Sequence, residues 1–245
     1  MKKVELSERM QAVADFVTNG NRVCDVGCDH GYVSIYLVQE KIAPSVLAMD
    51  VNKGPLLRAK EHVQQYDMER YITLRLSDGL TAYEPGEADT LICAGMGGRL
   101  LQSILEKEAE KTADFKELIL QPQSEIGAFR RFLRNEGYCI LAENMILEDG
   151  KFYPMMKAVP GDKTVLCEGE GTQSLKITME DMFGPLLLKQ KHPVLLQFLH
   201  FEKEMKEGIL KKLQEKEVSD KTEVRKKELE EELRMIAEAI GQFDK

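Results

Sequence analysis

No stretch of the 245-residue sequence approaches the roughly 18 unbroken apolar residues of a membrane span, because Lys and Glu interrupt every Leu-rich segment. The amino terminus, MKKVELSERMQ, carries lysines but no apolar segment after them, so it does not have the pattern of a secretory signal. These two absences predict a cytoplasmic protein with no membrane partner.

The sequence also lacks an excess of positive charge and a metal-binding cysteine pattern. Lys and Arg number 34 against 42 Asp and Glu, and the formal charge of −8 argues against nonspecific coating of nucleic acid, although it permits a local basic face. The five cysteines contain no C-x-x-C pair, and Cys24-x3-Cys28-x-His30 is no recognisable zinc pattern, so we expect no metal. The sequence does not define the oligomeric state, and we slightly favour a monomer.

Up to residue 160, short apolar segments alternate with amphipathic ones. A helix is predicted over 5–19, and strands are predicted over 22–26, 45–50, 71–76, 90–94, 117–121, 138–147 and 152–159. The segments after the first five strands have a helical pattern, which is typical of a parallel sheet covered on both faces. The last two strands are separated by Glu148-Asp149-Gly150-Lys151, which predicts a hairpin and therefore an antiparallel edge.

The composition changes near residue 160. Residues 160–177 are rich in Gly and polar residues and are interpreted as a linker. Short helical pieces at 178–191 precede two long helical segments, about 193–217 and 220–242, whose apolar residues recur at helical spacing. The sequence therefore predicts an α/β domain over residues 1–160 and an all-α, coiled-coil-like helical hairpin domain over residues 161–245.

The strongest indication of a site is DVGCDHGY, residues 25–32, between the first strand and a helix. Glycines in such a turn let the backbone approach a ligand, and the helix that follows offers free N–H groups. A dinucleotide fingerprint would need G-x-G-x-x-G, but Asp29 and Tyr32 stand where two of the glycines would be. There is no G-x-x-x-x-G-K-[ST], which removes the P-loop interpretation. An ordinary tight turn remains the alternative.

Three further motifs follow the next three strands. Asp50 could accept both hydroxyl protons of a ribose, and Ser77-Asp78-Gly79 could accept the exocyclic amine of an adenine. The sequence Ala94-Gly95-Met96-Gly97-Gly98-Arg99 ends the fourth strand. Carboxyl ends of parallel strands share the rim on which open α/β sheets bind ligands. Each acid alone is more often a turn or cap residue, but the four motifs in order favour a ligand site.

This order of motifs resembles that of class I S-adenosylmethionine-dependent methyltransferases. Asp25, Gly27 and Gly31 match the D-x-G-x-G-x-G of that class, with Asp29 in place of the middle glycine. More narrowly, DVGCDHGY, AMDVNKGPL, SDGL, AGMGG and QPQ are similar to the bacterial tRNA (adenine-22 N1)-methyltransferase family, TrmK. The resemblance is close over residues 1–160 and extends to the layout of the tail. It implies a Rossmann-like sheet, S-adenosyl-L-methionine as cofactor and methylation of N1 of an adenine in the D-loop of tRNA.

The resemblance also implies roles for individual residues. The cofactor-binding residues would be Asp25, Gly27, Cys28, Gly31, Asp50, Val51, Asp78, Gly79, Gly95 and Met96. The Gly95–Gly98 loop stands where amino-methylating relatives carry N-P-P-Y or D-P-P-Y, a departure that suits a ring nitrogen with its own in-plane lone pair. The catalytic candidates are Asp29, to stabilise the cationic product, and His30 and Tyr32, to orient or stack the base. The alternatives are that Asp29 caps the next helix and that His30 closes its own turn.

The tRNA partner would need basic residues for its phosphates. The candidate contacts are Arg99, Arg130, Arg131, Lys189 and Lys191, with further groups at Arg134, His192, Lys211-Lys212 and Arg225-Lys226-Lys227. Each of these groups is more often part of an ordinary solvated face. Two other functions stay open: a methyltransferase acting on a small molecule, against which the basic tail helices argue, and a non-catalytic RNA-binding protein on the same fold.

Overall fold

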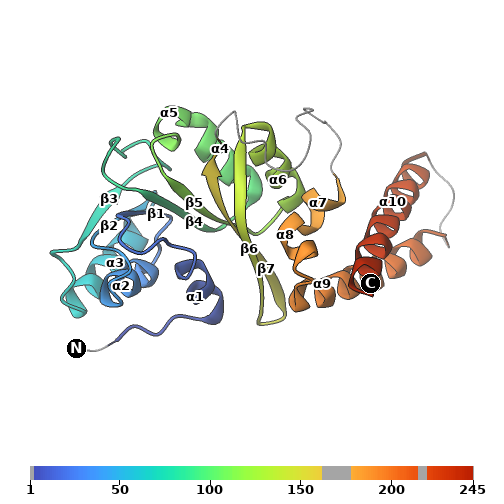
Figure 1. Cartoon of the computed structure of the whole chain (residues 1–245), viewed down its shortest axis with the longest axis horizontal. Coiled ribbons are helices and arrows are strands. Elements are labelled where there is room, and N and C mark those ends of the chain that lie inside the picture. Colours follow the sequence, from blue (N-terminus) through green and yellow to red (C-terminus); the bar gives the residue numbers. More distant parts are fainter. Residues whose placement is uncertain (1–2, 162–177, 215–219, 245) are drawn as a thin grey trace. The chain divides into compact units, whose positions relative to one another are not determined.

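The computed structural model describes residues 3–161, 178–214 and 220–244. The chain divides into two compact units, residues 1–175 and 176–245. The first unit is a seven-stranded sheet with helices on both faces, and the second contains only helices among its described residues (Figure 1). No helix in the described parts of the chain is long and apolar enough to cross a bilayer.

The sheet has the order β3-β2-β1-β4-β5-β7-β6. The parallel strands are β1 (Val23–Val26), β2 (Val46–Asp50), β3 (Ile72–Leu76), β4 (Thr90–Met96) and β5 (Glu117–Pro122). The edge is the antiparallel pair β6 (Tyr138–Glu148) and β7 (Lys151–Pro160), as the hairpin motif predicts. The chain runs outward from β1 to β3 and then returns to the other side of β1 as β4. The ligand-binding crevice of such a sheet lies at this reversal, between β1 and β4.

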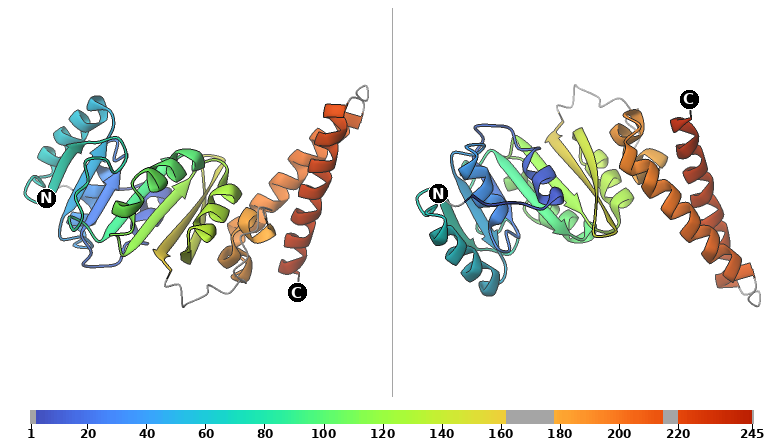
Figure 2. Two further views of the ribbon diagram at one scale, coloured as in Figure 1. Left: turned by 90° about the horizontal axis from the view of Figure 1, so that it is seen from above. Right: turned by 90° about the horizontal axis from the view of Figure 1, so that it is seen from below.

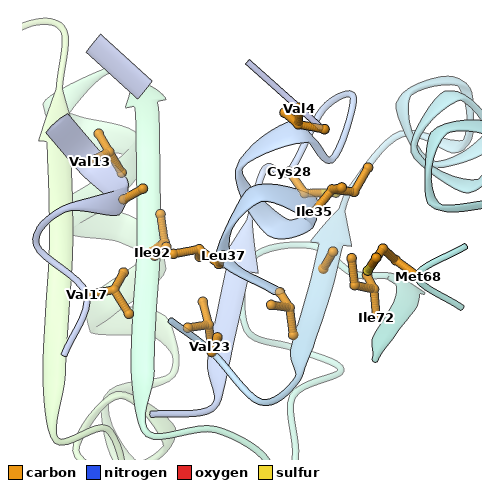
Figure 3. Packing of buried hydrophobic residues seen from close by; sticks show 14 of the residues in the cluster. Val4, Val13, Val17, Val23, Cys28, Ile35, Leu37, Met68, Ile72 and Ile92 are labelled. Carbon is orange, nitrogen blue, oxygen red and sulfur yellow. The ribbon is translucent and has the colours of Figure 1, made fainter. Parts of the chain in front are cut away.

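Side chains alternate between the two faces of the sheet and give each face its own core. Val23 and Ile92 pack with α1 (Glu8–Ala14), α2 (Tyr32–Gln39) and α3 (Lys53–Gln65) on one face. Figure 3 shows Val13 and Val17 beside Ile92, with Leu37 between β4 and β1. On the other face, Cys24 and Cys93 pack with α4 (Gly98–Lys107) and α6 (Ile126–Asn135); the short α5 (Ala109–Thr112) follows α4. Because both faces of the sheet are covered, side chains that point either way are buried, and β1, β2 and β5 are buried along their whole length.

The first helix is shorter than the predicted 5–19, because side chains accept hydrogen bonds from backbone N–H groups near both of its ends. Ser7 Oγ caps the start, and α1 ends at Ala14. Phe16 and Val17 then bond to carbonyls only three residues back, and the Thr18 N–H donates to the Glu117 carboxylate of β5 at 2.8 Å. A long-range acceptor on the sheet therefore stops the helix, which no local pattern reveals.

The second unit is helical as predicted. Its helices are α7 (Met179–Phe183), α8 (Pro185–Lys189), α9 (Pro193–Gln214) and α10 (Asp220–Phe243). Figure 2 shows α9 and α10 running side by side, and Lys206 of α9 lies 2.8 Å from both Glu202 and Glu232, the latter on α10. The fold class is thus confirmed. Most of the predicted linker, residues 162–177, and the end of the first long helical segment lie outside the described residues, so the domain boundary stays a prediction.

Candidate active site

The loops after β1 and β4 contact each other at the reversal of the sheet. The Gly27 and Cys28 N–H groups both donate to Met49 O of β2, at 2.8 and 3.0 Å. Gly27 has a φ of +75°, and a Cβ there would collide with Met96 Cε. The positive φ favours glycine here, and the Met96 side chain would have to move away from any Cβ. The first and fourth motifs therefore lie next to each other at this edge of the sheet.

Asp25, near the end of β1, is bonded across this turn to α2. Its carboxylate is buried and accepts a hydrogen bond from Ser34 Oγ of α2 at 2.7 Å. Burial raises the pKa of the Asp25 carboxyl from 3.8 to about 6, with a further increase from the charge of Asp50, while the Ser34 hydrogen bond opposes the shift. Asp25 therefore connects β1 to α2 and holds together the two ends of the turn between them.

The end of β2 carries the features expected for a ribose site. Asp50 is only 8% exposed, and one of its oxygens accepts the Asn52 N–H at 2.8 Å. Its second oxygen has no hydrogen bond within the described parts of the chain, and the next side chain, Val51, is exposed. The Ser77 N–H donates to Asp50 O at 3.0 Å, which brings the third motif alongside. The free carboxylate oxygen of Asp50 is a suitable acceptor for the ribose hydroxyls of a nucleoside cofactor, and the third motif lies beside it.

The third motif is more open than the second. Asp78 forms an ion pair with Lys107 of α4 at 3.0 Å, and both side chains are exposed. Gly79 has a φ of +57°, and a Cβ there would lie 3.1 Å from Ile104, so α4 packs closely against this turn. Asp78 is at the rim but already has a cationic partner.

The catalytic candidates form an aromatic cluster with a residue of α3. The rings of Tyr32 and His62 stack with centroids 4.5 Å apart, and His30 stacks at 6.0 Å from Tyr32 and 5.7 Å from His62. His62 Nδ1 lies 2.9 Å from His30 O, and because a carbonyl only accepts, Nδ1 carries a proton. In neutral His62, Nε2 is then the acceptor for the Tyr32 hydroxyl at 3.2 Å. We name His30, Tyr32 and His62 the ring cluster.

Asp29 lies beside the ring cluster and faces outward. Its carboxylate is 3.5 Å from His30 Nε2 and 3.9 Å from Arg58, with 64% of the side chain exposed. The residue that caps α2 is Gly31, with no side-chain hydrogen bond, so the interpretation of Asp29 as a helix cap is wrong. His62 and Arg58 were missed from the sequence. The signal was present, since residues four apart share one face of a helix.

The QPQ motif supports the β4 loop. Gly95 has a φ of +79° and its N–H donates to Gln121 Oε1 at 3.0 Å. The Gln123 N–H donates to Met96 O at 2.8 Å. Two glutamines of one motif thus hold two consecutive residues of the loop.

Among the proposed RNA contacts, Arg130 must be corrected. Its side chain is only 2% exposed and pairs with the buried Glu143 of β6 at 2.8 Å, so it stabilises the packing of α6 and is not available to a phosphate. Arg99 is highly exposed and pairs with Glu125 at 2.7 Å. Arg131 is half-buried, and Lys189 and Lys191 are exposed in the second unit.

Within the described residues, no group of three or more His, Cys, Asp or Glu could hold a metal.

The strand order and the motifs on the rim define the class of protein as a Rossmann-like methyltransferase. A family model described as "Methyltransferase domain" matches residues 6–156. The chain is 32% identical to the tRNA (adenine(22)-N(1))-methyltransferase of Bacillus subtilis over 240 residues, which cover 98% of this chain and 99% of that protein. It belongs to the tRNA (adenine(22)-N(1))-methyltransferase family.

Solved structures agree with this assignment. The B. subtilis M1A22 tRNA methyltransferase TrmK matches with a TM-score of 0.85 and 31% identity, covering 97% of this chain and 100% of that one. Streptococcus pneumoniae Sp1610 in complex with S-adenosyl-L-methionine matches with a TM-score of 0.82 and 32% identity, covering 96% and 100% of the two chains. Both similarities extend over nearly the whole chain, including the helical unit.

Proposed function

We propose that this protein methylates N1 of the adenine at position 22, in the D-loop of tRNA, with S-adenosyl-L-methionine as cofactor. The observation that carries the proposal is the contact of the Gly27 turn with Met96 at the reversal of the sheet, where the Gly27 N–H also donates to Met49 O, one residue before Asp50. The curated relative of B. subtilis, named for this reaction, and the cofactor-bound Sp1610 structure support it.

The bound cofactor would supply an electrophilic methyl group on a sulfonium. Asp50 would accept the ribose hydroxyls, and Val51, Asp78 and Gly79 would surround the adenine ring. The methionine side would lie along the Gly27–Gly31 turn, including Cys28, and the Gly95–Met96 loop. Gly27, Gly31 and Gly95 have positive φ values, which glycine adopts readily, and they place no side chain on this wall.

The target N1 has an in-plane lone pair, so no base is needed to activate it. The N1–carbon bond forms as the carbon–sulfur bond breaks, its electron pair goes to sulfur, and the positive charge moves to the adenine. Catalysis then consists of alignment and stabilisation of this charge. The exposed Asp29 carboxylate is suited to the second task. The ring cluster offers a stacking surface for the base, with His62 fixing the Tyr32 ring.

N1 takes part in base pairing, so a paired target must be unpaired or flipped before attack. Recognition of folded tRNA by its shape needs a wider surface than one sheet domain. We assign this to a helical domain over residues 161–245, with Lys189 and Lys191 as phosphate contacts, together with Arg99 and Arg131 of the first unit. The substrate implies a protein of the cytoplasm.

The test is nucleoside mass spectrometry of unmodified tRNA incubated with the protein and S-adenosyl-L-methionine. We expect N1-methyladenosine in a D-loop fragment, and none without cofactor. A matched tRNA with guanine at position 22 should remain unmodified. Methylation of another position or another nucleobase atom would contradict the proposed specificity. Cofactor binding without methylation of any RNA would instead favour the small-molecule or non-catalytic alternatives.

A further inference from the structure

A buried glutamine connects the β4 loop to the first helix. Gln121, at the end of β5, has no exposed surface, and its Oε1 accepts both the Gly95 N–H and Arg9 Nη1, each at 3.0 Å. Its Nε2 donates to Pro122 O at 3.3 Å. Because both partners of Oε1 are donors, the orientation of this amide is unambiguous.

Arg9 is itself held from two sides. Its guanidinium carbon lies 4.9 Å from the centre of the Tyr153 ring of β7, within range for a cation–π interaction. Its backbone N–H donates to Glu148 Oε1 at 3.0 Å, and its Nε lies 3.8 Å from Glu148 Oε2. With 17% of the side chain exposed, the guanidinium is mostly withdrawn from solvent.

The backbone N–H of Gly95 bonds to a side chain, that of Gln121. The register of β4 against β5 shifts between Ala94 and Met96, so Gly95 lies at an irregularity of the ladder. With a φ of +79°, its N–H points to the side chain of Gln121. A hydrogen bond from a cation is stronger than one from a neutral donor, so Arg9 helps to fix the position of the amide oxygen that Gly95 also uses. Arg9 also borders the loop, since a Cβ on Gly95 would lie 3.7 Å from Nη1.

We propose that Arg9 is a positioning residue for the methyl-transfer step, which fixes the Gly95–Met96 loop through Gln121. The proposal rests on the proposed function, in which this loop borders the reacting methyl group. Methyl transfer requires collinear alignment, and displacements near 1 Å can cost about 100-fold in rate. Direct contact of Arg9 with the target base is unfavourable, because the methylated adenine is a cation. A contact with a tRNA phosphate is the competing role.

The first experiment compares Arg9→Met, Arg9→Lys and the exposed-site control Arg70→Met in the full chain. For Arg9→Met we expect kcat to fall roughly 10- to 100-fold, the range for losing a hydrogen bond from a charged group. The KM for tRNA and its dependence on salt should not change. Lys keeps one donor and should restore part of kcat, while Arg70→Met should match the wild type. An unchanged kcat, or a raised tRNA KM with a flatter salt dependence, would overturn the proposal, the latter in favour of a phosphate contact.

The second experiment tests whether Arg9 acts through Gln121. Gln121→Met keeps the length of the side chain but removes the shared acceptor, so Arg9→Met should cost nothing further in that background. Additive losses would refute the connection. Thermal unfolding monitors each variant, and Arg9→Lys carries the test if Arg9→Met does not fold. Wild-type protein that binds S-adenosylhomocysteine but leaves tRNA unmethylated would refute the proposed function, whereas an active wild type with an unaffected Arg9→Met refutes only the positioning role.

Discussion

Asp29 offers the sharpest test of the proposed chemistry, because it is an exposed carboxylate in place of a glycine of the methyltransferase pattern. It makes no capping hydrogen bond to α2, and its neighbours are His30 at 3.5 Å and Arg58 at 3.9 Å. Asp29→Asn keeps the shape and one acceptor but removes the charge. Asn also tolerates the left-handed backbone of this position, with its φ of +47°, so the fold should be unaffected.

The size of the effect follows from the charge that moves onto the adenine. Opposite charges about 4 Å apart attract by roughly 1 kcal/mol in water and roughly 4 kcal/mol at an effective dielectric constant of about 20. With about 1.4 kcal/mol for each factor of ten, the fall in kcat is on the order of 10- to 1000-fold. Because the side chain is 64% exposed and Arg58 offsets part of its charge, we expect the lower half of this range.

The assay is methyl incorporation into tRNA at saturating tRNA and cofactor, alongside the affinity for S-adenosylhomocysteine. We expect kcat to fall with little change in this affinity, as for an interaction made mainly in the transition state. The matched control is Asp149→Asn, another acid with positive φ (+49°), in the β6–β7 turn. Turnover of Asp29→Asn near that of the control would refute electrostatic stabilisation by Asp29.

Three further predictions concern the cofactor site, its pH dependence and the helical unit. Asp50→Ala should weaken S-adenosyl-L-methionine binding roughly 30- to 150-fold by calorimetry, since a charge-assisted acceptor is lost, and unchanged affinity would remove the ribose assignment. The raised pKa of Asp25, about 6, means that the folded protein loses stability as pH rises from about 4 to 6. Asp25→Asn should therefore be more stable than the wild type at pH 8, on the order of 1–3 kcal/mol in denaturant titrations, with the difference gone near pH 4; parallel pH profiles would contradict this. Deletion of residues 176–245, checked for folding, should retain cofactor binding but methylate tRNA poorly, and full activity on tRNA would exclude a substrate-binding role.

Most of the sheet could be predicted because its determinants are local. Continuous apolar strands, the turn residues between them and the 148–151 hairpin each constrain only their own segment, and the strand bounds lie within a few residues of the predicted ones. The length of α1 could not be predicted, because Glu117, about a hundred residues away in the sequence, takes the Thr18 N–H. Local patterns identify the elements, and tertiary hydrogen bonds set some of their ends.

The site shows the same division. Motifs at the carboxyl ends of strands predict the rim, because the parallel topology brings those ends together. The residues contributed by helix faces were missed: His62 and Arg58 on α3, and Arg9 on α1. Arg9 contacts Gln121 of β5 together with Glu148 and Tyr153 of the antiparallel edge, and these contacts are long-range. Arg130 was misassigned for the converse reason. A basic residue beside Arg131 has the pattern of a charged surface, and only the packing of α6 on β6 reveals its buried partner.

The backbone at Asp29 explains how a carboxylate can stand where the wider class has glycine. A left-handed conformation costs most side chains about 1–2 kcal/mol, but Asp and Asn adopt it more readily than other non-glycine residues. The turn keeps glycine at position 27, where a Cβ would displace the end of the Met96 side chain, and at position 31, where a Cβ would lie 3.3 Å from Ala59 Cβ. Position 29 therefore accepts a charged side chain at small conformational cost, and that charge is exposed beside His30 of the ring cluster. Asp29 thus replaces a glycine at a position whose backbone tolerates the side chain. In the proposed reaction, its charge would stabilise the cationic adenine.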